Sequence, residues 1–298
     1  MFRSTAIVHL LTTERQKKMN LHSADNRDSK VVQAFGEEWA RFSQQSLVAS
    51  ERAAIFADYF AIFPWSLLPE APRGADIGCG SGRWAAVVAD KVGHLACIDA
   101  SPQALDVARR NLMGASNVDF HVADVGSLPF ADAELDFAYS LGVLHHVPDT
   151  GRAIAEIVRC LKPGGIFLVY LYYALDNRPL WFRLMWRASN AARGLISRLP
   201  SRLRFPICDL IAAGVYWPLA KFSALQEKTG MSVAHLPLSY YRDKSFYVMR
   251  TDALDRFGTR LEKRFSRNEI TAMLKDCGLT DIAFSPRAPH WCAVARKA

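Results

Sequence analysis

The chain of 298 residues has little of what defines several classes of protein. Its six cysteines include no C-x-x-C pair and no histidine spacing suited to zinc, so we expect neither a disulfide framework nor a metal site. Charges or prolines interrupt every apolar stretch before it is long enough to cross a membrane. The apolar run at the N-terminus is too short for a signal peptide. The sequence therefore predicts a globular, cytoplasmic protein.

Acidic residues are scarce in one part of the chain. Residues 171–250 carry twelve Lys and Arg against four Asp and Glu, whereas the remainder carries 25 of each sign. The whole net charge of +8 therefore lies in this segment. The simplest interpretation is a solvated helical surface; the others are weak association with a membrane surface, attraction to an anionic acceptor, and attraction to RNA.

Short apolar strands alternate with helices through the first half of the chain. The predicted strands cover 93–100, 117–124, 134–144 and 166–173, and the predicted helices cover 101–115 and 150–161. Such an alternation indicates a Rossmann-like, doubly wound and mostly parallel α/β sheet with helices on both faces. Ligands of such sheets bind beyond the carboxyl ends of the strands.

The pattern changes after residue 173 and returns near residue 266. Between them, apolar residues at helical spacing are interrupted by glycine and prolines, which predicts several short helices. Ser266 and Glu269 form a capping box for a helix over 266–279, and two strand-like runs follow as a closing antiparallel hairpin. We thus predict a disordered segment 1–30, a core 31–171, a helical and aromatic lid insertion 172–262, and closing elements 263–298.

The sequence ADIGCGSG at 75–82 predicts a ligand-binding loop. Its glycines follow the pattern G-x-G-x-G, whereas a nicotinamide-binding turn would be G-x-G-x-x-G. A tight turn without a ligand is the alternative. Asp99 ends the next strand, where a carboxylate can accept both hydroxyls of a ribose, and Asp124 ends the third, where it could accept from an adenine amino group. With Asp76, three acids at successive strand ends indicate a nucleoside cofactor.

The chain resembles the class I S-adenosylmethionine-dependent methyltransferases, in the broad group related to the ubiquinone and menaquinone C-methylases. The motifs are ADIGCGSG, ACIDASPQALDVARRN, FHVADVGSLPFADAELDFAYSLGVLHHVPD and EIVRCLKPGGIFLVY, which cover about 75–170. The resemblance implies S-adenosylmethionine as cofactor, covered by the segment 35–42. The implied contacts are Asp76, Gly78, Cys79 and Gly80 with the methionine moiety, Asp99 and Ala100 with the ribose, Asp124 and Val125 with the adenine, and Ser140 and Leu141 with the sulfonium end.

The sequence LGVLHHVPD, just after the fourth predicted strand, holds the candidate base. We predict His145 as the proton acceptor, because an imidazole titrates near neutrality, and interpret His146 as a packed or capping residue. In sugar O-methyltransferases that resemble this chain, such a histidine works with an acid after the fifth strand. Here Leu171 and Tyr172 occupy that region, so we predict that Tyr172, or alternatively Tyr173, helps position the acceptor.

The segment 238–252, LSYYRDKSFYVMRTD, combines rings and charges without helical periodicity, as in a loop that reaches into a pocket. We predict that Tyr241 and Arg242 bind the acceptor, and that Trp181, Trp186 and Trp217 form the core of the lid. The expected activity is methyl transfer to a small molecule, with O-methylation ahead of C- or N-methylation. The expected acceptor is hydrophobic or aromatic and carries an acidic group.

Two other functions stay open from the sequence. An RNA methyltransferase would suit the net charge and the arginines among aromatic residues in LWFRLMWR, but no RNA-binding domain is visible, which disfavours a nucleic acid partner. A relative that binds the cofactor without transferring methyl groups is the second alternative. The sequence leaves the oligomeric state open.

Overall fold

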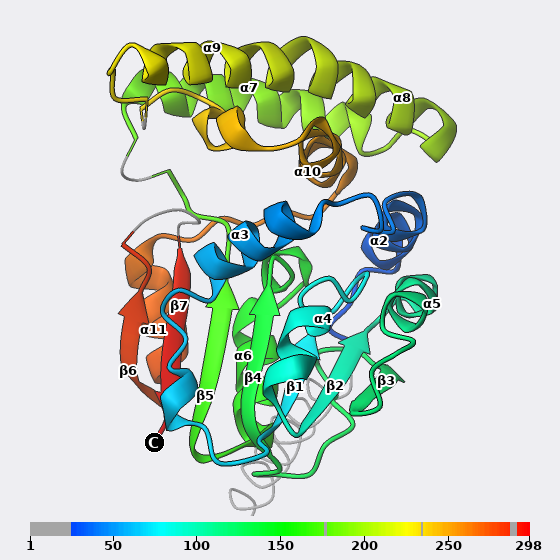
Figure 1. Ribbon diagram of the computed structural model, residues 1–298, viewed down its shortest axis with the longest axis vertical. Helices are drawn as coiled ribbons and strands as arrows, with labels where there is room; N and C mark the ends of the chain where they lie inside the picture. The colour runs from blue at the N-terminus through cyan, green and yellow to red at the C-terminus, as the bar shows by residue number, and fades with distance from the viewer. Residues whose placement is uncertain (1–24, 176–177, 234, 287–290) are drawn as a thin grey trace, which may run out of the picture.

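A computed structural model describes residues 25–175, 178–233, 235–286 and 291–298. Seven strands form one sheet in the order β3-β2-β1-β4-β5-β7-β6 (Figure 1). The neighbours among β1 to β5 pair in parallel, and β7 pairs antiparallel with both β5 and β6. This confirms the predicted α/β class and the closing hairpin. The strands are β1 Arg73–Ile77, β2 His94–Asp99, β3 Val118–Val122, β4 Leu135–Leu141, β5 Leu161–Tyr170, β6 Leu279–Phe284 and β7 Cys292–Lys297.

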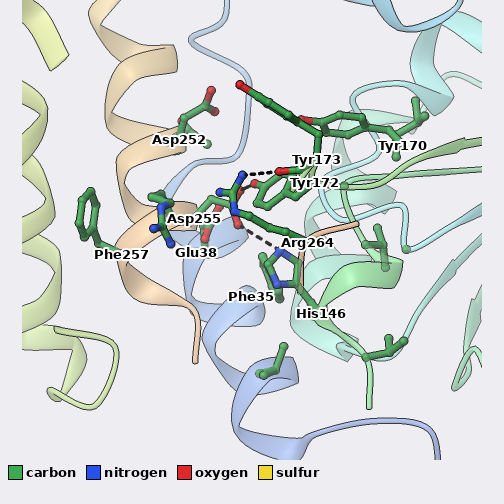
Figure 2. A pocket seen from close by; sticks show the side chains of 18 of the residues that line it. Phe35, Glu38, His146, Tyr170, Tyr172, Tyr173, Asp252, Asp255, Phe257 and Arg264 are labelled. Atoms are coloured by element: carbon green, nitrogen blue, oxygen red, sulfur yellow. Dashed lines mark hydrogen bonds and ion pairs between the residues drawn. The ribbon is translucent and has the colours of Figure 1, made fainter. Parts of the chain in front are cut away.

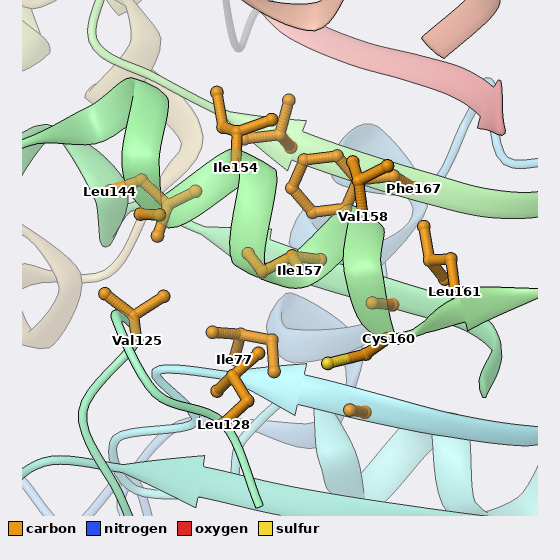
Figure 3. Packing of buried hydrophobic residues seen from close by; sticks show 14 of the residues in the cluster. Ile77, Val125, Leu128, Leu144, Ile154, Ile157, Val158, Cys160, Leu161 and Phe167 are labelled. Carbon is orange, nitrogen blue, oxygen red and sulfur yellow. The ribbon is translucent and has the colours of Figure 1, made fainter. Parts of the chain in front are cut away.

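The sheet separates two hydrophobic cores because successive side chains of a strand point to opposite faces. In β4, Ala138 belongs to one core, whereas its two neighbours Phe137 and Tyr139 belong to the other. The first core is covered by α6 Thr150–Cys160 and α11 Arg267–Asp276 (Figure 3). The second is covered by α3 Ala49–Tyr59, α4 Ala85–Val88 and α5 Pro102–Asn111.

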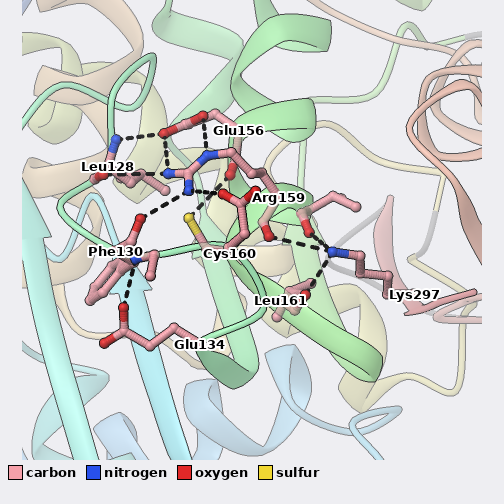
Figure 4. A network of polar contacts seen from close by, with 11 residues as sticks. Leu128, Phe130, Glu134, Glu156, Arg159, Cys160, Leu161 and Lys297 are labelled. Carbon is pink, nitrogen blue, oxygen red and sulfur yellow. Dashed lines mark hydrogen bonds and ion pairs between the residues drawn. The ribbon is translucent and has the colours of Figure 1, made fainter.

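Local capping signals define several helix ends. Ser101 accepts from the amide of Ala104 at the start of α5, and the predicted capping box of Ser266 and Glu269 is present at α11. At the carboxyl end of α6, Lys297 Nζ donates to the carbonyls of Val158 and Leu161, both at 2.7 Å (Figure 4). A cation there satisfies carbonyls that have no partner within the helix.

The lid consists of helices that lie over the carboxyl ends of the strands (Figure 1). These are α7 Leu180–Ile196, α8 Ser201–Ile211, the π-helical turn η4 Ala212–Tyr216, α9 Trp217–Lys228, the short η5 Ser239–Asp243 and α10 Phe246–Gly258. The expectation of a loop over 238–252 is wrong, because the Ser245 side chain caps α10 and most of this segment is helical. The expected core role of Trp181 and Trp217 is also wrong, since about half of each side chain is exposed.

The N-terminal described residues are folded against the sheet. Asn26 is buried, and its amide side chain bonds the backbone of Asp149 through both its oxygen and its nitrogen. Helix α2 Ser29–Arg41 follows and packs against α5 and α10. The predicted disorder therefore does not hold for residues 26–30, and residues 1–24 lie outside the described part of the chain. Within that part, no helix has the length and apolar character needed to span a membrane.

Candidate active site

The glycine loop at the end of β1 leaves space for a ligand and for a tryptophan above it. Gly78 and Gly80 both have positive φ, at 79° and 54°. The amides of Gly78 and Cys79 donate to the carbonyl of Ile98 in β2, which holds the turn tightly against the sheet. A Cβ on Gly80 would lie 2.7 Å from the Trp39 ring, so α2 covers this loop closely. Glycine is thus required here by both backbone conformation and contact.

The acids at the ends of β2 and β3 face the same cavity. Asp99 accepts from the amides of Gly80 and Ser101, at 2.9 and 2.8 Å. Each of its oxygens keeps a lone pair for a further donor. Asp124 accepts through Oδ1 from the amide of Gly126, while its buried Oδ2 has no partner among the described residues. A buried carboxylate oxygen without a partner is costly unless a ligand supplies the donor.

Four of the ten residues expected to contact the cofactor do not line the cavity. Asp76 instead accepts from the Tyr139 hydroxyl at 2.9 Å, and burial raises its pKa to about 7. Ser140 is fully buried and donates to the carbonyl of Ile77. The Cys79 side chain is buried and Gly80 lies under Trp39, so these positions shape the loop from behind.

One cavity of about 570 Å³ runs from the strand ends to the lid. At the sheet end its lining includes Gly78, Asp99, Ala100, Asp124, Val125 and Leu141. At the lid end its lining includes Phe35, Glu38, His146, Tyr172, Tyr240, Tyr241, Asp252 and Asp255, several of which appear in Figure 2. The two ends together could hold a nucleoside cofactor and an acceptor.

The two histidines occupy different environments. His145 has no exposed surface, both of its ring nitrogens lack partners among the described residues, and it does not line the cavity. Burial lowers the pKa of His145 well below its usual value. His146 lines the cavity; its Nδ1 lies 2.6 Å from the carbonyl oxygen of Leu261, and its Nε2 lies 3.6 Å from Asp255 Oδ1 (Figure 2). The geometry therefore favours His146 over His145 as the residue able to exchange a proton with a ligand.

The carboxyl groups of Glu38, Asp252 and Asp255 surround the lid end of the cavity. Asp255 accepts from the Tyr172 hydroxyl, and Asp252 accepts from the Tyr241 hydroxyl at 2.8 Å. The Glu38 carboxyl is almost fully buried and accepts no hydrogen bond from a described residue. Burial raises the pKa of all three, that of Asp252 to about 6, and the mutual repulsion of the three carboxylates adds to the effect at Glu38. Such groups suit a ligand that donates hydrogen bonds.

The two residues predicted to bind the acceptor lie in different places. Tyr241 lines the cavity as expected, whereas Arg242 pairs with Glu227 at 2.9 Å on the lid surface and does not line it. The cavity contains other guanidinium groups. Arg256 and Arg264 both pair with the buried Glu262, while Arg83 lies over the Trp84 ring, 4.3 Å from its centroid, with no ion pair to a described residue.

The sequence analysis did not identify Glu38, Arg83, Asp252 or Asp255. Asp252 and Asp255 stand three residues apart in α10, a spacing that puts both on one face of a helix. This spacing is visible in the sequence, but the lack of helical periodicity over 238–252 predicts a loop at Asp252. No comparable signal marks Glu38, because its burial depends on the packing of α2 against α10.

Residues 75–169 match the family model described as "Methyltransferase domain". A methyltransferase from Streptomyces halstedii, GfsG, is 27% identical over 165 residues, which are 54% of this chain and 53% of that protein. A demethylmenaquinone methyltransferase from Clavibacter sepedonicus is 34% identical over 97 residues, which are 33% of this chain and 40% of that protein. The chain thus spans about half the length, or less, of these curated relatives.

Among solved structures, a SAM-dependent methyltransferase from Methanosarcina mazei is 22% identical, with a TM-score of 0.47 over 79% of this chain and 98% of that one. We draw no conclusion from a likeness at this level. The strand order, the glycine loop, and the strand-end acids with the unpartnered Asp124 Oδ2 fit the cofactor of the matched family. Residues 75–169 are therefore a methyltransferase domain.

Proposed function

We propose that the chain transfers a methyl group from S-adenosylmethionine to a small-molecule acceptor, with a hydroxyl oxygen as the preferred methyl acceptor and carbon or nitrogen behind it. The observation that carries the proposal is one continuous cavity, which has the strand-end acids Asp99 and Asp124 at one end and His146 among carboxyl groups and aromatic rings at the other. Van der Waals contact with rings and hydrogen bonding to carboxylates would orient an acceptor without any further group.

The sheet end of the cavity would hold the cofactor, which supplies a methyl group already activated on a sulfonium. Asp99 would accept from the ribose hydroxyls, and Asp124 Oδ2 from the adenine amino group. Arg83 is a cation beside the glycine loop that lacks an anionic partner among the described residues, so it suits the carboxylate of the methionine moiety. Trp39, above Gly80, would exclude water from this end.

His146 would accept the proton that the acceptor hydroxyl loses. A carbonyl oxygen can only accept, so the contact with Leu261 requires the proton on Nδ1 and leaves a lone pair on Nε2 that can accept a proton. Asp255, 3.6 Å from Nε2, would stabilise the imidazolium that forms. Tyr172 donates to Asp255 and so holds that carboxylate in place. This assignment replaces the predicted base His145, which has no access to the cavity.

The walls support a hydrophobic or aromatic acceptor with hydroxyl groups. Tyr172, Tyr240 and Tyr241 contribute rings, and Glu38, Asp252 and Asp255 contribute hydrogen-bond acceptors. The expected acidic group on the acceptor depended on Arg242, which is paired outside the cavity lining. The proposed acceptor therefore needs no acidic group.

The test has two parts. Calorimetry with S-adenosylhomocysteine should detect one site per chain in the wild type. Incubation with methyl-labelled S-adenosylmethionine and cell extract, separated into chloroform-soluble and water-soluble fractions, should place the label in a small molecule. The His146→Gln variant should bind the cofactor product but transfer little label. Label that appears only in RNA, or binding without any transfer, would reject the proposal in favour of one of the two alternatives.

A further inference from the structure

Exposed apolar side chains concentrate on the lid. Among the described residues, seventeen large hydrophobic side chains are exposed, and thirteen of them lie between residues 180 and 246. Monomeric soluble proteins rarely expose a contiguous apolar patch of this kind, and such patches usually mark an interaction surface. Helices α7 to α9 are the layer of the molecule farthest from the sheet in Figure 1. Their exposed apolar side chains form two stripes, one on α7 and one on α8 to α9.

In α7, the stripe follows helical spacing on the side opposite the protein interior. Trp181, Leu184 and Leu195 are exposed, at 50%, 51% and 74%. Arg193, on the other side of the helix, is buried and donates to the carbonyls of Thr259 and Arg260. The exposed stripe is therefore a feature of the folded lid and not the result of a loosely attached helix.

The continuous helix formed by α8, η4 and α9 has the same arrangement. Its buried side includes Arg204, Cys208 and Tyr216, which pack toward α2 and α10. Its other side exposes a second set of large apolar residues: Leu203, Leu210, Trp217, Phe222 and Leu225. We call the two sets together, Trp181, Leu184, Leu195, Leu203, Leu210, Trp217, Phe222 and Leu225, the outer lid face.

The charges around the outer lid face have one sign. Arg183, Arg187, Arg202, Lys221 and Lys228 are exposed and have no ion pair with a described residue. Residues 180–228 contain two acids, Asp209 and Glu227. Both are already paired, with Arg41 and Arg250 and with Arg242 respectively. The face thus combines apolar side chains with unneutralised cations.

We propose that the outer lid face binds the surface of an anionic membrane, with its apolar side chains in the headgroup region and its cations on the lipid phosphates. Amphipathic helices with basic and aromatic residues bind membrane interfaces in this way without spanning them. A second copy of the chain fits poorly, because a two-fold contact would bring the same patch and its cations against themselves. The charge therefore selects an anionic surface.

The same lid helices also bound the cavity. Met185 in α7 and Val215 in η4 both line the cavity and are partly exposed, at 42% and 45%. We expect an acceptor held in the membrane to reach the cavity past these two helices. Entry of the acceptor from the membrane rests on the proposed function, whereas membrane binding does not. Such an entry route would suit an amphipathic acceptor that is soluble in lipid.

The experiment is co-sedimentation of the full chain with vesicles, without cofactor or acceptor. Vesicles of phosphatidylcholine with 30% phosphatidylglycerol should bind the chain, and vesicles of phosphatidylcholine alone should bind it at least tenfold more weakly. Raising the salt from 0.1 to 0.5 M should weaken the binding to anionic vesicles. The fluorescence of exposed Trp181 and Trp217 should shift to the blue on binding, and replacing both by Phe should remove most of that shift.

Two sets of variants distinguish binding through the outer lid face from a general effect of the net charge of the chain. Arg183→Gln, Arg187→Gln and Arg202→Gln together should weaken vesicle binding by about 100-fold, since each cation at such a surface is worth about 1 kcal/mol. The matched control, Lys91→Gln, Arg110→Gln and Lys275→Gln, removes the same charge from exposed sites outside the lid and should change binding less than threefold. Leu184→Ser with Phe222→Ser should also weaken binding.

The proposal is overturned if the wild type remains in the supernatant, or if the control triple loses as much binding as the lid triple. A dimer in analytical ultracentrifugation that dissociates in the Leu184→Ser, Phe222→Ser variant would instead assign the face to a second copy. Because no measurement here uses methyl transfer, failure of the proposed function would leave these results unchanged. Conversely, a chain that transfers methyl groups but ignores vesicles would reject membrane binding alone.

Discussion

His146 Nδ1 lies 2.6 Å from the carbonyl oxygen of Leu261, a residue 115 positions further along the chain. This contact joins the loop after β4 to the segment after α10, and the other ring nitrogen, Nε2, lies 3.6 Å from Asp255 Oδ1. The orientation of the proposed base therefore depends on how the end of the lid is placed.

We expect His146→Gln to lower turnover by about 100-fold, the usual effect of losing a general base, while the affinity for S-adenosylhomocysteine stays within twofold. His145→Gln is the matched control. It should reduce stability, because it replaces a fully buried ring that stacks on Tyr172 with centroids 3.8 Å apart, yet leave turnover of the folded fraction within about fivefold. Steady-state kinetics with an acceptor identified by the labelling experiment would measure both. The reverse order of effects would restore His145 as the base.

Tyr172→Phe should lower turnover by about tenfold with little change in cofactor affinity. The substitution keeps the ring but removes the hydroxyl that donates to Asp255, a loss of about 1.5 kcal/mol for a hydrogen bond to a charged group. Asp255 would then be held less firmly beside His146. If the ring of Tyr172 only lines the cavity, the Tyr172→Phe variant should keep the wild-type turnover.

Asp99→Asn should weaken binding of S-adenosylhomocysteine by about 10- to 100-fold. The carboxylate accepts from two backbone amides and has capacity left for ribose hydroxyls, whereas an amide in its place presents one nitrogen that cannot accept. Calorimetry on the two proteins would measure the loss, and exposed Asp106→Asn serves as the control. An affinity equal to that of the wild type would remove the ribose assignment.

The unfolding free energy should fall as the pH rises from about 4 to 7. Burial raises the pKa of Asp76 from 3.8 to about 7, so the folded state keeps a proton that the unfolded state releases in this range. Stability is thus highest below the unfolded pKa and declines by about 1.4 kcal/mol per pH unit until the folded pKa is passed.

Asp76→Asn should remove most of this slope, since the amide oxygen can still accept from the Tyr139 hydroxyl without ionising. Denaturant titrations at pH 5 and pH 7 would give the slope for both proteins. A slope that is the same in the variant would assign the effect to the carboxyl groups of the lid, such as Asp252 with its pKa of about 6.

Tyr241→Phe and Arg242→Ala should differ in their effects. Tyr241→Phe removes the donor to Asp252 in the cavity wall, so acceptor turnover should drop by about tenfold while cofactor affinity is preserved. Arg242→Ala breaks an ion pair on the lid surface, which is worth at most about 1 kcal/mol, and should leave turnover within twofold. A large loss in Arg242→Ala alone would return the basic contact to the acceptor site.

The sequence by itself determined the mostly parallel sheet with its closing hairpin, the strand-end acids at the sheet end of the cavity, and the helix caps. These features depend on short patterns: alternation in strands, glycines with positive φ such as Gly78, and the Ser266 and Glu269 pair three residues apart. Each pattern acts within one or two neighbouring elements, where geometry follows directly from the order of residues. For the same reason Asp99 and Asp124 could be placed at one edge of the sheet in advance.

The residues that line the lid end of the cavity could be identified only from the tertiary structure. Glu38 comes from α2, His146 from the loop after β4, and Asp255 from α10, and no local pattern relates them. Which of two adjacent histidines lines the cavity depends on a carbonyl 115 residues away. Likewise, helical spacing shows that Trp181 and Trp217 lie on amphipathic helices, but only the packing of those helices on α10 determines that these rings point outward. Burial is a property of the whole assembly of elements, and long-range packing is what a single sequence specifies least directly.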